Sequence, residues 1–78
     1  MVEVIEDFEA LKDYAQYCRL VLYSMEEAGD TTRVRVRVGR LGFDQYLPKP
    51  KLKEIEAWLT AHDALKVVDV VDDAFFFV

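Results

Sequence analysis

The chain has 78 residues, a formal net charge of −5 and a hydrophobic content of 53%, which suits one small domain (residues 1–78) and excludes a disordered composition. A single cysteine, Cys18, excludes a disulfide within the chain. The N-terminus is acidic and the apolar runs are far shorter than about 20 residues. We therefore expect neither a signal peptide nor a membrane span, and we expect a cytoplasmic location.

Charge is sorted along the chain by segment. Residues 1–30 carry a net charge of −6, residues 31–53 a net charge of +6 and residues 54–78 a net charge of −5. The basic residues of the middle segment are Arg33, Arg35, Arg37, Arg40, Lys49, Lys51 and Lys53. Sorted charge acts on partner choice and association rate more than on fold, so it indicates a surface that meets a partner.

The first predicted element is one long amphipathic helix over residues 7–28. Apolar residues recur at spacings of three and four, the helical period, at Phe8, Leu11, Ala15, Cys18, Leu22 and Met25. Asp7 is the expected N-cap, and Gly29 is expected to close the helix in a left-handed conformation. Ahead of the helix, Val2, Val4 and Ile5 fit either a short extended lead-in or an early turn.

A hairpin follows the predicted helix. Residues 31–38 alternate at period two, which predicts a strand with Val34, Val36 and Val38 facing the core and the three intervening arginines facing away. The segment 39–42 contains two glycines and is the expected turn, and residues 43–47 return as the second strand. Pro48 ends that strand because proline has no N–H to donate.

The second half repeats the helix–hairpin order. Pro50 suits the first turn of a helix over 50–62, in which Leu52, Ile55, Leu59 and His62 share a face beside Trp58. Strands are predicted at 65–71 and 74–78, joined by a turn at residues 72–73. The sequence therefore predicts an α+β two-layer sandwich in the order α-β-β-α-β-β, with a four-stranded, mainly antiparallel sheet and both helices on one face.

Arg33, Arg35 and Arg37 form the first candidate site. On a strand they project in one row about 6.5–7 Å apart, close to the phosphate spacing of a nucleic-acid strand, and Arg40, Lys49 and Lys51 extend the positive field. The row fits an acidic protein partner or nucleic acid. It also fits a solvated or salt-bridged sheet face balanced by the many carboxylates of the chain, because charge on an edge strand also prevents aggregation.

Apolar residues left outside the core form the second candidate site. A helical wheel places Tyr17, Leu20 and Tyr23 opposite the core face of the first helix, which predicts an interface with a partner or a second copy. In the last strand, alternation separates Phe75 and Phe77 from Phe76 and Val78, so one pair needs a cover. Phe76 and Val78 are therefore the candidate residues of a homodimer.

No catalytic or cofactor motif stands out, and we expect no enzyme activity, no cofactor and no metal. Cys18 is expected as a buried small hydrophobe, and His62 as a capping or packing residue. Asp69, Asp72 and Asp73 could together recruit a hard cation, but turns commonly contain Asp. A catalytic pair of carboxylates has no distinguishing spacing in this sequence.

The sequence favours a non-enzymatic protein–protein interaction module that acts by stoichiometric binding and dimerises. In class, though in no motif, such a body resembles the small inhibitors that phages and mobile elements use against host nucleic-acid machinery. One alternative is a nucleic-acid-binding accessory domain that uses Arg33, Arg35, Arg37, Arg40, Lys49 and Lys51. Another is a structural homodimer with no further activity.

Overall fold

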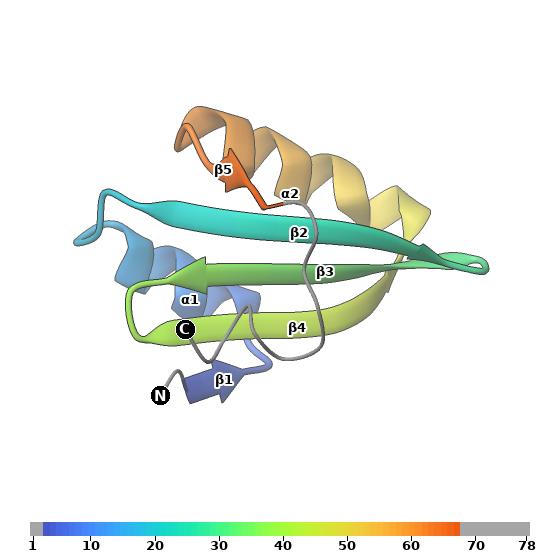
Figure 1. Cartoon of the computed structure of the whole chain (residues 1–78), viewed down its shortest axis with the longest axis horizontal. Helices are drawn as coiled ribbons and strands as arrows, with labels where there is room; N and C mark the ends of the chain where they lie inside the picture. Colours follow the sequence, from blue (N-terminus) through green and yellow to red (C-terminus); the bar gives the residue numbers. More distant parts are fainter. Residues whose placement is uncertain (1–2, 68–78) are drawn as a thin grey trace.

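The architecture is two layers, a mixed β-sheet with two helices against one face (Figure 1), as seen in a computed structural model that describes residues 3–67. The elements in chain order are β1 (Glu3–Ile5), α1 (Phe8–Ala15), β2 (Val21–Ala28), β3 (Thr31–Val38), β4 (Leu41–Pro48), α2 (Lys49–Ala61) and β5 (Leu65–Lys66). The sheet order is β1-β4-β3-β2-β5. The α+β class and the two helices are confirmed.

The sheet contains five strands among the described residues, not four. β2, β3 and β4 form an antiparallel meander, while β1 adds parallel to β4 and β5 adds parallel to β2. The mainly antiparallel four-strand prediction is therefore only partly right. Of the two alternatives for the residues before the first helix, the extended one is observed, as β1. This strand lies at the edge of the sheet and pairs with β4, Glu3 opposite Leu41 and Ile5 opposite Phe43.

The predicted helix over 7–28 is wrong in its second half. Asp7 caps α1 as predicted, with its carboxylate accepting from the Glu9 N–H at 3.0 Å, but α1 ends at Ala15 and residues 21–28 form β2. All eight residues of β2 pair with β3, from Val21 opposite Val38 to Ala28 opposite Thr31. This ladder outweighs a helical period in a segment whose aromatic and β-branched residues suit a strand.

The hairpins follow local signals. Each has a two-residue turn with glycine first, and both glycines have positive φ, +65° at Gly29 and +56° at Gly39, as such turns require. Gly29 therefore has the predicted left-handed conformation, but in a hairpin turn and not at a helix end. β4 spans Leu41–Pro48, longer than the predicted 43–47, and α2 lies one residue earlier than the predicted 50–62.

The core lies between the helix layer and one sheet face. Val34, Val36 and Val38 are fully buried as predicted, together with Phe43 from β4. The helices contribute Leu11 and Ala15 from α1 and Ile55 and Leu59 from α2. Phe8 joins the two helices to the sheet, since its ring lies edge-on to Phe43 at 5.1 Å and to Trp58 at 5.3 Å between centroids.

Three predictions fall wholly or partly beyond the described residues. The strand over 65–71 begins as predicted at Leu65, but only Leu65–Lys66 is described as β5. The strand over 74–78, with the dimer candidates Phe76 and Val78, lies outside the described residues, as do Asp69, Asp72 and Asp73. No described helix is long and apolar enough to cross a membrane.

Candidate partner-binding surface

The arginine row of β3 lies on the sheet face opposite the helices, as alternation predicts. Its first member, Arg33, forms a bidentate ion pair with Asp44 of β4, donating from Nε to Asp44 Oδ1 at 2.9 Å and from Nη2 to Asp44 Oδ2 at 2.7 Å. These hydrogen bonds raise the pKa of the Arg33 guanidinium further above its already high value. Arg33 also lies near the Tyr46 ring, 5.9 Å from its centroid.

The other two arginines of the row also have interactions within the chain. Arg35 is only 3% exposed, and its Nη2 lies 3.9 Å from Glu26 Oε2. Arg37 is half-buried and donates from Nε to the Gly39 carbonyl at 3.3 Å. The three arginines are therefore not equivalent, exposed cations. Arg33 in particular fits the alternative that the row is a salt-bridged sheet face.

Tyr17, Leu20 and Tyr23 do not form one face of a helix. Tyr17 and Leu20 lie in the loop between α1 and β2, where they are 86% and 57% exposed. Tyr23 lies on β2, half-buried, with its side chain on the helix side of the sheet because it pairs with the buried Val36. Two of the three candidates thus remain available to a partner, at a different place from the one predicted.

The end of α1 and the loop after it, which contains Tyr17 and Leu20, pack against the turn between β3 and β4. A Cβ built on Gly39 would lie 3.1 Å from Tyr14 Oη and 3.4 Å from Cys18 Sγ, so the absence of a side chain at Gly39 permits this close approach. Cys18 is thus a half-buried packing residue of the loop and not of a helix. Arg19 in the loop and Arg40 in the turn are both exposed.

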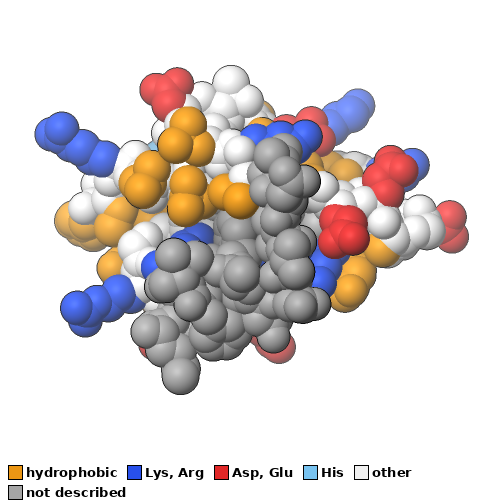
Figure 2. Space-filling model, viewed as in Figure 1, with side chains coloured by type: hydrophobic (Ala, Val, Ile, Leu, Met, Phe, Trp, Pro, Cys, Tyr) orange, Lys and Arg blue, Asp and Glu red, His pale blue; other side chains and the backbone are white. Residues whose placement is uncertain are grey.

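A surface hollow of about 580 Å³ lies at this junction, lined by Cys18, Arg19, Leu20, Leu22, Arg37 and Gly39. Leu22 pairs across the sheet with Leu65, which is 56% exposed. We call the exposed or half-exposed residues here the loop-end patch: Tyr17, Arg19, Leu20, Leu22 and Leu65. At the left end of Figure 2, hydrophobic side chains gather between two projecting basic ones.

The remaining candidate cations lie elsewhere. Lys49, Lys51 and Lys53 are exposed on α2, which leaves the opposite end of β4 from the Gly39–Arg40 turn. Among the basic residues of the segment 31–53, Arg37 lines the hollow of the loop-end patch, and Arg40 follows Gly39 in the turn beside it. Arg19 was not among the predicted site residues. Its position near Arg37 at the hollow could not be predicted from the sequence, because it depends on where α1 ends.

His62 and the acidic residues show no arrangement for metal binding in the described part of the chain. No group of three or more His, Cys, Asp or Glu side chains there is placed to hold a metal ion. His62 is the C-cap residue of α2; its Nδ1 lies 3.1 Å from the Trp58 carbonyl and its ring 4.4 Å from the indole. These are the packing contacts expected for it.

Comparison with known proteins adds no family. No protein-family model matches the chain, and no curated protein matches it significantly.

Proposed function

We propose that this chain is a protein-binding module that acts by stoichiometric binding, without a catalytic step, and that the loop-end patch is its docking surface. The observation that carries the proposal is the exposure of Leu20 at a hollow that Arg19 also lines. Exposed Tyr17 lies in the same loop, and exposed Leu65 pairs with Leu22 of the lining. Large apolar side chains grouped at one place on a small protein mark interaction sites more often than scattered ones do.

The chemistry of the patch selects the kind of partner. Leucine and tyrosine side chains supply apolar contact area, and arginine at the border favours a carboxylate that it can bind through two hydrogen bonds. The fitting partner is a protein surface with an apolar side chain next to acidic residues. An inhibitor of a nucleic-acid-processing protein, of the kind that phages and mobile elements encode, is one form of this function.

The test is affinity capture from a lysate of the source organism at moderate salt, with nuclease. A partner at stoichiometric yield is expected with the wild type and with Tyr46→Ala, which removes an exposed tyrosine outside the patch. Capture should fall at least about tenfold with the double substitution Tyr17→Ala and Leu20→Ala, since truncating anchor side chains costs about 1–2 kcal/mol or more each. Arg19→Glu should act similarly, and Lys53→Glu should not.

Three other results would contradict the proposal. Co-eluting material that absorbs at 260 nm and disappears with nuclease would favour the nucleic-acid alternative, for which Lys49, Lys51 and Arg40 are the exposed candidates. An eluate that contains only the bait, or a partner captured equally well by the double variant, would exclude the patch as a docking surface. A homodimer would be recognised by light scattering, and its loss in the double variant would assign the patch to self-association.

A further inference from the structure

The outer edge of β2 is only partly occupied by β5. Their register pairs Leu22 with Leu65 and Tyr23 with Lys66 and goes no further among the described residues. In Figure 1, β5 lies beside the first half of β2 and ends short of its second half. Residues 24–28 of β2 therefore have one edge paired with β3 and one edge with no described strand beside it.

The direction of the backbone groups on that edge follows from one hydrogen bond. Val67 donates its N–H to the Tyr23 carbonyl at 2.8 Å, so the backbone polar groups of Tyr23 point away from β3. Backbone direction alternates along a strand, which puts the N–H and C=O groups of Met25 and Glu27 on the same outer side. Those four groups are a template for another strand.

A hollow of about 500 Å³ opens on the helix side of this edge, between β2 and α2. Its apolar lining includes Tyr23, Met25 and Leu59, and Glu56 and Asp63 lie at its border. An added strand sends alternate side chains to the helix side of the sheet. The hollow therefore offers space for one such side chain, with an apolar wall for its stem and carboxylates for its head.

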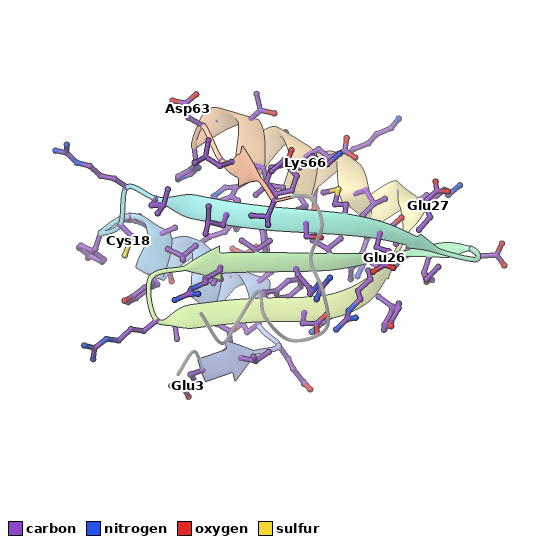
Figure 3. All side chains as sticks on the ribbon, viewed as in Figure 1. Glu3, Cys18, Glu26, Glu27, Asp63 and Lys66 are labelled. Carbon is purple, nitrogen blue, oxygen red and sulfur yellow. The ribbon has the colours of Figure 1, made fainter. Side chains whose placement is uncertain are left out.

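The charge along the edge is acidic. Glu26, Glu27, Glu56 and Asp63 are exposed, and Lys66 is the one basic residue among the described residues that line the hollow. Figure 3 shows Asp63 and Lys66 above the first half of β2, and Glu26 and Glu27 near its far end. A long cationic side chain, Arg or Lys, matches both the apolar wall and the acidic border.

We propose that the outer edge of β2 over residues 24–28, which pairs with no strand among the described residues, binds an extended basic segment of a partner protein by strand addition, with an Arg or Lys side chain in the hollow beside Glu56 and Asp63. Main-chain hydrogen bonds to Met25 and Glu27 supply affinity, and the hollow supplies side-chain selection. This surface is separate from the loop-end patch and goes beyond the function proposed for that patch.

Two competing occupants are disfavoured by charge. A second copy of β2 pairing antiparallel would bring Glu26 and Glu27 toward their own equivalents, and like charges across a strand pair are destabilising. The residues of this chain beyond Val67 contain Asp69, Asp72 and Asp73 and no basic residue. A basic strand has no such penalty, and β3, with its Arg–Val alternation, already pairs with the other edge of β2 over eight residues.

A peptide with the sequence of β3 is the natural probe, because β3 already pairs with β2 over eight residues. A capped octapeptide with the β3 sequence, Thr-Thr-Arg-Val-Arg-Val-Arg-Val, is titrated into ¹⁵N-labelled full-length protein, and a matched peptide carries Glu in place of each Arg. Amide hydrogen exchange is read by NMR. In the free protein the Met25 and Glu27 amides should exchange at least about tenfold faster than those of Ser24 and Glu26, which face β3.

Addition of the basic peptide should slow exchange at Met25 and Glu27, and the acidic peptide should not. Glu27→Pro removes an N–H that faces outward, so it should abolish binding while keeping the β2–β3 ladder. If that variant does not fold, Glu27→Gln with Glu56→Gln decides instead. It should weaken the basic peptide about three- to tenfold and reduce the salt dependence of binding. Lys53→Gln is the control, on the same helix but not lining the hollow.

Four results would overturn the proposal. Slow exchange of Met25 and Glu27 in the free protein at all concentrations would mean that residues 68–78 already occupy the edge, and protection that rises with protein concentration would mean a second copy. Equal binding of both peptides, or none, would remove the basic partner. Because Tyr17→Ala and Leu20→Ala lie outside this edge, their effect on lysate capture tests the other surface independently.

Discussion

The contact of Gly39 with Tyr14 and Cys18 gives the sharpest prediction for the fold beneath the loop-end patch. Gly39→Ala places a Cβ on a residue with φ +56°, 3.1 Å from Tyr14 Oη and 3.3 Å from Tyr14 Cε2. Gly29→Ala is the matched control, because φ there is +65° and nothing lies within 4 Å of the added Cβ. The two variants therefore share the backbone cost and differ in the steric one.

The backbone cost, which both variants share, and the steric cost, which only Gly39→Ala has, can be given separate magnitudes. A left-handed conformation costs an L-residue about 1–2 kcal/mol, offset by about 0.4–1 kcal/mol through the reduced entropy of the unfolded chain, so Gly29→Ala should lose about 1 kcal/mol. Overpacking adds about 1–2 kcal/mol for Gly39→Ala. In a domain of this size the extra loss lowers Tm by roughly another 5–15 °C.

Urea unfolding followed by the fluorescence of Trp58, the one tryptophan of the chain, measures both free energies of unfolding. Tyr14→Phe in the Gly39→Ala background should recover part of the loss, because it removes the atom nearest the new Cβ. Equal destabilisation by Gly39→Ala and Gly29→Ala would refute the reasoning, and would mean that Tyr14 of α1 and Cys18 of the loop do not pack on the turn as described.

Three further predictions concern stability and geometry. Arg33→Lys should lower the free energy of unfolding by about 1 kcal/mol, because lysine cannot make the bidentate pair with Asp44. This is below the usual range for a charge-assisted pair because both side chains are about a quarter exposed. Arg40→Lys, in an exposed turn, is the control and should change the free energy of unfolding by less than about 0.5 kcal/mol in the same assay. Asp7→Ala should cost about 1 kcal/mol by removing the N-cap of α1, and Asp7→Asn should restore most of it. Phe8→Leu should cost about 1–2 kcal/mol and shift the Trp58 emission, because it removes the edge-on contact of the two rings at 5.3 Å; an unchanged emission spectrum would contradict the packing of α1 against α2.

The parts of the fold with strong local signals were predictable. Valine alternation identifies β3, a glycine-first turn identifies the β3–β4 hairpin, and Pro48 and Pro50 place the boundary of α2. β2 was missed because its apolar residues satisfy two periods at once: Leu22 and Met25 continue a helical spacing, while Val21, Tyr23 and Met25 alternate. The choice between them depends on pairing with β3, which is information outside the segment.

Part of the site geometry was also within reach of the sequence. A two-residue turn at Gly39–Arg40 pairs Val38 with Leu41, and counting outward pairs Arg35 with Asp44 and Arg33 with Tyr46. Asp44 is then the diagonal neighbour of Arg33, a spacing that a long side chain can bridge. The ion pair was thus implied by the hairpin. The loop-end patch was not, because it needs the end of α1 and the position of β5.

The surface charge that a partner meets differs from the charge written along the chain. Residues 31–53 carry most of the cations, but Arg33 is bound to Asp44 and Arg35 is buried near Glu26. The exposed positive charge beside the apolar patch comes instead from a loop and a turn, at Arg19 and Arg40. The acids of β2 and α2 gather along another edge of the sheet. Strand pairing therefore places Arg33 and Arg35 beside carboxylates and leaves two exposed surfaces of opposite charge. If partners bind these surfaces as proposed, raising the salt concentration should weaken binding at both while leaving the folded core unchanged.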